Sequence, residues 1–388
     1  MGTITIGDSC EVLNGYAFKS EKYTSSGIRI IRIANVQKGY IEDDSPVFYQ
    51  TADVDLNKYM LRENDLLVSL TGNVGRTALL TKDMLPAALN QRVACLRLKT
   101  NKITRGFLFH LLNSDYFESK CIQSSQGVAQ KNLSTEWLKS YDLPLYSLSK
   151  QNEITKILDN LRNTIILKEQ EIQKYDELIK ARFIEMFGDP LDGSAKYPIH
   201  KVGEVADTID PQPSHRTPPI DESGIPYISI KDCDYKTGRI DFEGARKVGR
   251  KVLEEQSKRY TLHDGDFVIG KIGTIGNPVF IPPRDDYTLS ANVVLVQPNN
   301  NLVSPYFLKY SLESVYVNRQ FAEAKNSTSQ AAFGIQKVRT IKVMNPDLNI
   351  QRKFDHFVKQ VDKSREEVKK SLEKTKQLYD SLMQEYFG

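Results

Sequence analysis

The sequence is poor in the residues that build metal centres and disulfide frameworks. It has four cysteines and five histidines among 388 residues, and none falls into a CxxC or HExxH pattern. Cysteines scattered in this way are typical of reduced thiols in a cytosolic protein, so we expect neither disulfide nor zinc chemistry. The cysteines are Cys10, Cys95, Cys121 and Cys233, and the histidines are His110, His200, His215, His263 and His356.

Long hydrophobic runs are also missing. No apolar stretch approaches the roughly 20 residues that a membrane-spanning helix needs. Residues 1–6 have neither the basic start nor the apolar segment of a secretory signal. Hydrophobic residues make up 40% and charged residues 26% of the chain, which is the balance of a soluble globular protein. We therefore expect a cytoplasmic protein without a membrane partner.

The chain has no large excess of charge of either sign. It carries 53 basic and 49 acidic residues, a formal net charge of +4. This balance permits nucleic acid as a partner without indicating it, because only a clustering of basic residues would be informative.

The common catalytic motifs are absent. There is no GxSxG elbow and no cysteine–histidine pair at a recognisable spacing. Residues 72–77 resemble a phosphate-binding loop, but two residues separate its glycines instead of four, and a strand-like segment follows. Residues 277–280 resemble a degenerate amino-methyltransferase tetrapeptide, which we interpret as coincidence because no glycine-rich cofactor loop accompanies it. We expect no catalytic residue, and a turn-capping role for the carboxylates of Asp65 and Asp266 at equivalent strand starts.

What the sequence does contain is an internal repeat. Gln151–Gly188 recurs, shifted by 200 positions, as Gln351–Gly388. Apolar residues alternate in steps of four and three along both copies, which predicts a long helix with a coiled-coil seam, roughly 55 Å long at about 1.5 Å per residue. Two seam positions, Lys168 and Arg365, are imperfect for a closed two-helix core, and we expect them to mark where a partner packs. The other seam residues are Ile154, Leu158, Leu161, Ile165, Ile172, Tyr175 and Ile179, and Phe354, Val358, Val361, Val368, Leu372, Thr375 and Tyr379.

Each long helix follows a region rich in short strands. Residues 27–33, 65–70 and 93–98 have strand patterns, and residues 106–116 have the pattern of a helix. Corresponding segments return at 224–230, 262–268, 293–296 and 305–308, while the residues between them differ. The chain is also too long for one ordinary core. We therefore predict an α+β protein with two repeated mixed α/β domains, residues 1–150 and 189–350, and two long helices, residues 151–188 and 351–388.

Several short motifs occur in the same order in both halves. They are Asp65 with Gly72-Asn73-Val74-Gly75, Asp266 with Gly273-Thr274-Ile275-Gly276, the stretch Gln126–Ser134, Gln151 and Gln351 at the helix starts, and the closing Ile184–Gly188. In this order the chain resembles, over essentially its whole length, the specificity (HsdS) subunits of type I restriction-modification systems. The second domain departs from the first at residues 327–335 and has no counterpart of Arg76, so contact residues do not transfer simply between domains.

The resemblance implies a fold, partners and a division of labour. It implies two target recognition domains separated by an antiparallel pair of coiled-coil helices, with each domain reading one half of a bipartite double-stranded DNA target. The helices would fix the spacing of the two halves. Two methyltransferase (modification) subunits and two restriction (translocase-nuclease) subunits would dock on this scaffold and carry S-adenosylmethionine, ATP and Mg. The specificity subunit itself is not catalytic in that family.

Reading a DNA sequence requires polar side chains on exposed loops, above all Arg, Lys, Asn and Gln. A polar residue in a turn is more often solvated or capping than in contact with a base, but clustering after equivalent strands favours contact. In the first domain the candidates are Asn73, Arg76, Asn90, Gln91, Arg92, Gln130, Lys131 and Asn132. In the second they are Lys231, Lys271, Thr274, Asn292, Lys325, Asn326, Gln330 and Gln336.

Two other functions stay open. A non-catalytic coiled-coil scaffold for protein assembly agrees with the near-neutral charge, and failure to bind any duplex at any salt concentration would favour it. The chain could also be the DNA-recognition part of a fused methyltransferase-nuclease. We expect this less, because both ends of the chain coincide with the repeat.

Overall fold

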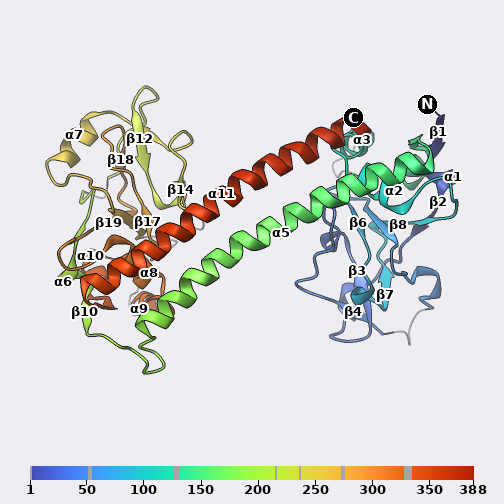
Figure 1. The fold of residues 1–388 in the computed structure, drawn as a ribbon. Helices are drawn as coiled ribbons and strands as arrows, with labels where there is room; N and C mark the ends of the chain where they lie inside the picture. Colours follow the sequence, from blue (N-terminus) through green and yellow to red (C-terminus); the bar gives the residue numbers. More distant parts are fainter. Residues whose placement is uncertain are drawn as a thin grey trace. The chain divides into compact units, whose positions relative to one another are not determined.

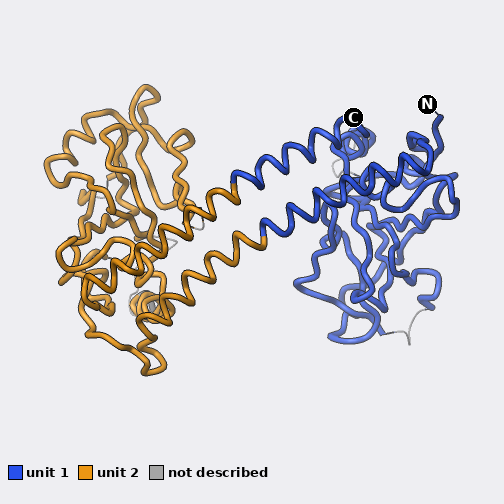
Figure 2. The backbone as a smooth tube through the Cα atoms, viewed as in Figure 1, with its two compact units in different colours: residues 1–169, 370–388 blue, residues 170–369 orange. Residues whose placement is uncertain are grey.

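The computed structural model describes residues 2–50, 55–125, 132–214, 216–235, 237–271, 276–326 and 334–388, except the side chains of Lys325 and Asn326. The chain forms two compact units (Figure 2). Unit 1 consists of residues 1–169 and 370–388, and unit 2 of residues 170–369. Each unit therefore contains part of both long helices.

Unit 1 is built on a four-stranded antiparallel sheet with the strand order β2, β8, β5, β6. A second sheet has the order β4, β3, β7, with β3 parallel to β7, and β1 pairs with β9. The elements of Figure 1 in this unit are β1 (Gly2–Thr5), α1 (Ile6–Ser9), β2 (Cys10–Asn14), β3 (Ile28–Ile31), β4 (Phe48–Tyr49), β5 (Leu66–Ser69), β6 (Thr77–Leu79), β7 (Ala87–Leu89), β8 (Val93–Leu98), α2 (Arg105–Leu112), α3 (Asp115–Ser124), α4 (Thr135–Ser140), β9 (Asp142–Leu145) and the first part of α5 (Leu148–Phe187).

Unit 2 repeats this plan. Its four-stranded sheet has the order β11, β19, β16, β17, its second sheet the order β15, β12, β18, and two strand pairs complete it. Its elements are β10 (Ile199–Lys201), α6 (Val202–Val205), β11 (Ala206–Ile209), β12 (Ile225–Ile228), β13 (Cys233–Asp234), β14 (Arg239–Ile240), β15 (Lys247–Val248), α7 (Lys251–Ser257), β16 (Phe267–Gly270), β17 (Val279–Phe280), β18 (Thr288–Leu289), β19 (Val293–Pro298), α8 (Pro305–Glu313), α9 (Val315–Asn326), α10 (Ile335–Thr340), β20 (Lys342–Met344) and the first part of α11 (Leu348–Phe387). The predicted repeat of mixed α/β units is confirmed.

The central strand of each four-stranded sheet is buried on both faces. Leu66 and Val68 of β5 lie in one core with α2, whereas Leu67 lies in a second core with the three-stranded sheet. In β16, Phe267 and Val268 are divided between two cores in the same way. Because strand side chains alternate between faces, a strand covered on both faces appears as a continuous apolar run. Burial on both faces holds each of these strands in place, so that only the loop that follows the strand is accessible to a partner.

Both long helices are anchored at their first turn by a buried glutamine. The side-chain oxygen of Gln151 accepts from the N–H of Thr104 at 2.8 Å, and its amide donates to the carbonyl of Lys102 at 2.8 Å. Gln351 accepts in the same way from Ser304, at 2.7 Å. A buried amide needs such partners, so the glutamine ties the start of each helix to its domain. Each helix has 40 residues and begins three residues before its glutamine. The two predicted long helices are confirmed, with starts at Leu148 and Leu348 instead of residues 151 and 351.

The two helices pack antiparallel within each unit. In unit 1, Ile154 of α5 shares a core with Phe387 of α11, and Lys168 further along α5 contacts Ser371. In unit 2, Phe187 of α5 packs against Phe354 of α11, with their ring centroids 5.5 Å apart. The core of each domain is thus completed by the C-terminal end of the helix that follows the other domain.

One predicted helix is divided in two. Residues 106–116 were expected to form a single helix, but α2 ends at Leu112 and α3 begins at Asp115. The side chain of Ser114 accepts from the N–H of Phe117 at 3.1 Å and caps α3. A serine that satisfies an unpaired N–H at a helix start competes with continuation of the previous helix, which explains the break.

Candidate nucleic-acid interface

A polar loop follows β5 at one edge of the sheet in unit 1. The hydroxyl of Ser69 donates to the carbonyl of Asn73 and accepts from the N–H of Arg76 at 3.0 Å. Gly75 has a φ of +85°, and a side chain there would collide with Cys121, so the turn requires glycine. The loop is held in one shape, and the Asn73 side chain is exposed.

Two other segments reach the same edge. The N–H of Leu70 donates to the carbonyl of Arg92 at 2.9 Å. On its other side, Thr71 forms a β-bridge with Asn132. The structure therefore brings Asn73, Arg92 and Asn132 together, and all three are exposed. Their side chains offer the donors and acceptors that base edges and phosphates accept.

The remaining unit 1 candidates have different surroundings. Gln91 is exposed, whereas Asn90 is only 6% exposed, and its side-chain oxygen accepts from the N–H of Arg92 at 3.1 Å. Asn90 therefore shapes the turn that presents its neighbours. The guanidinium of Arg76 donates to the side-chain oxygen of Gln37, which sequence reasoning had not singled out. Two candidates lie outside the described residues: Gln130 and Lys131.

The corresponding edge of unit 2 carries other side chains. The N–H of Lys271 donates to the carbonyl of Asn292 at 2.9 Å, as Leu70 does to Arg92 in unit 1. Lys271 is only 5% exposed, and its ammonium forms an ion pair with Asp210 at 2.6 Å. Asn292 is exposed. No local sequence pattern predicts the ion pair between Lys271 and Asp210, because the two residues are far apart in the sequence.

The other unit 2 candidates lie on helices or outside the described residues. Lys231 is exposed in a short 3-10 helix, Ile230–Asp232, and Gln336 is exposed in α10. Lys325 and Asn326 belong to the end of α9, and their side chains are not described. Thr274 and Gln330 lie outside the described residues.

The aspartates in front of β5 and β16 hold turns, as predicted. The carboxylate of Asp65 accepts from the N–H of Arg62 at 2.8 Å and forms an ion pair with Arg97 at 2.6 Å. Asp266 accepts from the N–H of His263 at 2.8 Å. Burial raises the pKa of the Asp266 carboxyl above its ordinary value, although its hydrogen bonds act in the opposite direction. These carboxylates serve the scaffold.

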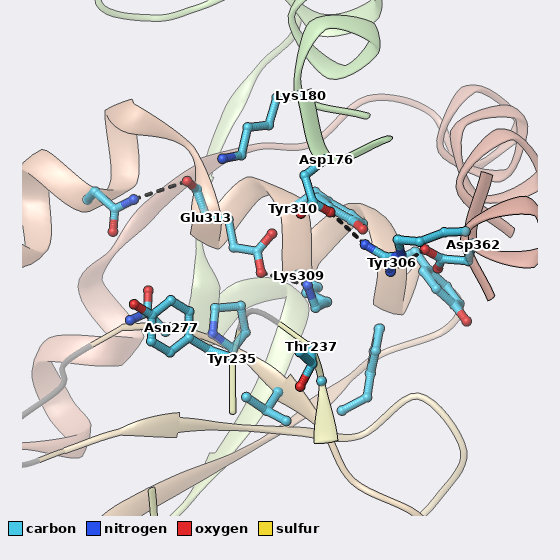
Figure 3. A pocket seen from close by; sticks show the side chains of 16 residues that line it. Asp176, Lys180, Tyr235, Thr237, Asn277, Tyr306, Lys309, Tyr310, Glu313 and Asp362 are labelled. Carbon is cyan, nitrogen blue, oxygen red and sulfur yellow. Dashed lines mark hydrogen bonds and ion pairs between the residues drawn. The ribbon is translucent and has the colours of Figure 1, made fainter. Parts of the chain in front are cut away.

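A pocket of about 540 Å³ opens in unit 2 beside the residues that precede β17. One wall holds Tyr235, Thr237 and Asn277, and the facing wall holds Lys309 and Glu313 of α8 (Figure 3). Sequence reasoning missed this site. The sequence feature that could have indicated the pocket is Tyr235, an aromatic residue in an otherwise polar segment. Its side chain is 46% exposed.

Lys168 and Arg365 pair across the helices within their own units. The ammonium of Lys168 donates to the hydroxyls of Ser371 and Thr375 at 2.7 and 2.8 Å. The guanidinium of Arg365 donates to Asp176 and Asp362, each at 2.6 Å. Polar groups on the helices thus occupy the ammonium of Lys168 and two nitrogens of Arg365, whereas the buried Nε of Arg365 has no partner among the described residues. That these positions mark where a partner packs stays a prediction.

The described residues offer little for metal, redox or membrane chemistry. Within these ranges, no three His, Cys, Asp or Glu side chains gather as ligands for a metal ion. The cysteines are free and buried, and burial raises the pKa of the Cys10, Cys121 and Cys233 thiols to about 12. Among the described helices, none has both the length and the apolar character for crossing a bilayer.

Residues 1–175 and 199–376 match the family model of the type I restriction modification DNA specificity domain. The chain is similar to the type I restriction enzyme EcoAI specificity subunit of Escherichia coli, with 34% identity over 165 residues, which are 41% of this chain and 28% of that protein. It is also similar to the MjaVIII specificity subunit of Methanocaldococcus jannaschii, with 27% identity over 188 residues, 46% of this chain and 43% of that protein. The matches thus span less than half of each relative.

The fold has a solved counterpart. The crystal structure of a type I restriction-modification system S subunit from M. genitalium is similar to 100% of this chain, over 96% of its own length, with a TM-score of 0.59 and 16% identity. At this identity the likeness concerns the fold alone. Because the family model covers both halves of the chain, the chain belongs to the type I restriction modification DNA specificity family, as its resemblance to the specificity (HsdS) subunits predicts.

Proposed function

We propose that the chain is the sequence-specific DNA-binding specificity subunit of a type I restriction-modification enzyme, and that each domain reads one half of a bipartite target. The observation that carries this proposal is the polar edge repeated in both units. In unit 1 the N–H of Leu70, directly after β5, donates to the carbonyl of Arg92 in the turn before β8. In unit 2 the N–H of Lys271, directly after β16, donates to the carbonyl of Asn292 in the turn before β19. A shared backbone frame with different side chains suits two readers of different sequences.

The long helices would set the distance between the two half-sites. Each is an uninterrupted helix of 40 residues, about 60 Å at about 1.5 Å per residue. Polar contacts of Lys168 in unit 1 and Arg365 in unit 2 join the helices near their middle. A paired helix changes length only by losing hydrogen bonds, so we propose a fixed spacer.

The same helices would hold the partner subunits. Leu167, which is 64% exposed, and Leu378 are uncovered on the helices in unit 1, as are Leu178 and Ile184 in unit 2. Exposed apolar residues on a paired helix suit a protein interface. We assign methylation and cleavage to two methyltransferase and two restriction subunits that carry S-adenosylmethionine, ATP and Mg, and we propose that this chain is not catalytic.

Selection from a library of random duplexes tests the proposed function. The full chain is incubated with its methyltransferase partner, and bound duplexes are sequenced. The expected result is two short motifs separated by a spacer of one length. Enrichment of no sequence at any salt concentration would favour the scaffold function. Two motifs at variable distance would overturn the role of the helices while leaving sequence reading intact.

A further inference from the structure

The pocket in unit 2 is lined by three carboxylates, Asp176, Glu313 and Asp362, and three cations, Lys180, Lys309 and Arg365, so its lining has no net charge. Lys309 forms an ion pair with Glu313 at 2.6 Å, and Arg365 forms ion pairs with Asp176 and Asp362, each at 2.6 Å. A charged ligand would have to compete with these pairs, and removing one partner of a buried pair is costly. The interior of the pocket therefore suits a group without net charge.

The remaining lining is aromatic and amide. Phe280 and Tyr306 lie with their ring centroids 4.9 Å apart, and Tyr235 stands exposed at the wall with Asn277 (Figure 3). The side chain of Asn277 has no hydrogen-bond partner within the described part of the chain, which leaves it a donor and an acceptor to offer. A planar ring with hydrogen-bonding groups on its edge fits this combination.

One of the three cations lies outside these ion pairs. Lys180 of α5 lines the pocket, is exposed, and forms no ion pair with any other described residue. A neutral ring linked to an anionic group would therefore find both parts of its chemistry here. A nucleotide is such a molecule, with an uncharged base and a charged phosphate.

The corresponding place in unit 1 is narrower: a pocket of about 110 Å³ there is lined by Lys38, Asn113 and Asp380. Its hairpin has four residues between Val36 and Ile41, whereas six separate Cys233 from Ile240 in unit 2. In unit 1 the ammonium of Lys38 forms ion pairs with Asp115 and Glu118 of α3 at 2.5 and 2.8 Å.

Two arginines also hold the hairpin of unit 1. The guanidinium of Arg162 on α5 donates to the carbonyl of Gly39 at 2.5 Å, and that of Arg76 holds Gln37. If the pocket were a docking site for two identical partner subunits, both repeats should contain it. A pocket built from the divergent hairpin of unit 2 suits a ligand peculiar to one half of the target.

We propose that this pocket receives a single nucleobase turned out of the duplex in the half-site read by unit 2, with the ring stacked on Tyr235 and its edge bonded to Asn277. This inference rests on the proposed function. The pocket is lined by Asn277, which follows in the sequence on the Gly273–Gly276 motif that contains the candidate Thr274. Extruded bases are held by aromatic stacking and by hydrogen bonds to their edge. The volume of the pocket, about 540 Å³, also lies within the range of small-molecule sites.

Fluorescence of 2-aminopurine tests the proposal. The analogue is placed at one position at a time in the duplex obtained by selection, and the full chain with its methyltransferase partner is added. One position in the second half-site should brighten, because the fluorescence of this base rises when it leaves the stack. Tyr235→Ala should remove that signal and weaken binding about tenfold, whereas Tyr235→Phe should keep both. Tyr40→Ala, at the exposed tyrosine of the unit 1 hairpin, is the matched control and should leave the signal unchanged.

The outcomes separate this inference from the proposed function. Binding of no duplex would overturn both. A bipartite preference without a brightened base in the second half-site, or a signal that Tyr235→Ala does not change, would overturn the pocket proposal alone. A loss of methyltransferase association in Tyr235→Ala, with unchanged fluorescence, would make the occupant an aromatic side chain of the partner and would also overturn it. Any 2-aminopurine signal from a base that the methyltransferase itself turns out is the same for the wild type and all variants. Such a signal therefore does not affect the comparison between them.

Discussion

Phe387 of α11 packs edge-on against Phe107 of α2, with their ring centroids 5.3 Å apart. The corresponding pair in unit 2, Phe187 and Phe307, packs in the same way at 4.7 Å. Each of these residues is buried. The end of each long helix is therefore part of a domain core, and a helix cannot leave its domain without opening that core. This is the physical basis for treating the helix pair as an integral part of both units.

Phe387→Ala should destabilise unit 1 by about 3 to 5 kcal/mol, because it removes a buried aromatic ring and leaves a cavity. Hydrogen exchange of the backbone amides in β5 and β8 measures the loss. Leu378→Ala on the exposed face of α11 is the control and should change stability by less than about 0.5 kcal/mol. Equal loss of protection in β16 and β19 of unit 2 would contradict the assignment of Phe387 to the core of unit 1.

Removal of one heptad from each helix should shorten the preferred DNA spacer. Residues 168–174 of α5 and 367–373 of α11 face each other, since Lys168 contacts Ser371 and Asp176 contacts Arg365. Deleting both segments keeps the seam in register and removes about 10 Å of helix, which is about three base pairs. Selection with randomised spacers measures the change.

The matched control for this deletion is the double variant Lys174→Ala and Glu373→Ala. Both residues are exposed within the deleted segments, so the variant should keep the original spacer. An unchanged spacer after the deletion would refute the proposal that the helices set the distance.

His110 should make the stability of unit 1 fall as the pH falls. Its ring is buried and contacts Asp159 at 2.8 Å, and burial lowers its pKa below the ordinary 6.5, with Asp159 acting in the opposite direction. A folded-state pKa below the unfolded one means that the unfolded chain binds the proton more tightly. The stability contributed by neutral His110 is therefore complete above about pH 6.5 and decreases as the pH falls towards the folded-state pKa.

Urea unfolding at several pH values between 7.5 and 5 measures this effect. His110→Gln should flatten the pH dependence of unit 1, whereas His263→Gln, at an exposed histidine, should leave it in place. If the urea midpoint of the wild-type unit 1 increased as the pH was lowered from 6.5 to 5, while that of His110→Gln did not change, the assigned direction of the pKa shift would be wrong.

The periodic features were predictable from the sequence, and the long-range pairings were not. The 3-4 spacing of apolar residues predicts the two long helices, and short continuous apolar runs predict the strands β5 and β8, which are buried on both faces. The ion pair between Lys271 and Asp210 leaves no such mark. Asn90, Gln91 and Arg92 look equivalent in the sequence, yet only the fold buries Asn90 and exposes its neighbours. Side-chain surroundings of this kind depend on which loops meet, and one sequence does not specify that.

Arg92 and Lys271, both candidates for DNA contact, should respond differently to substitution because their surroundings differ. Arg92 is exposed at the polar edge of unit 1, whereas the ammonium of Lys271 is buried against Asp210. Arg92→Ala should therefore weaken DNA binding without unfolding the domain. If Arg92 contacts a phosphate, all sequences should weaken together and the salt dependence should fall by about one ion, whereas a base contact should relax one position. Lys271→Met should instead destabilise unit 2 by about 3 kcal/mol, because it removes the buried ammonium from its ion pair with the partly buried carboxylate of Asp210.

Salt titrations of DNA binding and urea unfolding, performed on both variants, separate these effects. Gln91→Ala, next to Arg92 and also exposed, serves as the control for a neutral side chain at the same edge and should leave the salt dependence unchanged. Full DNA affinity in Arg92→Ala would remove this residue from the interface. A stable Lys271→Met variant with reduced affinity would mean that the ammonium leaves Asp210 to reach DNA. In that case the ion pair would be a resting position of a reading residue, and the buried lysine would join the exposed ones as part of the interface.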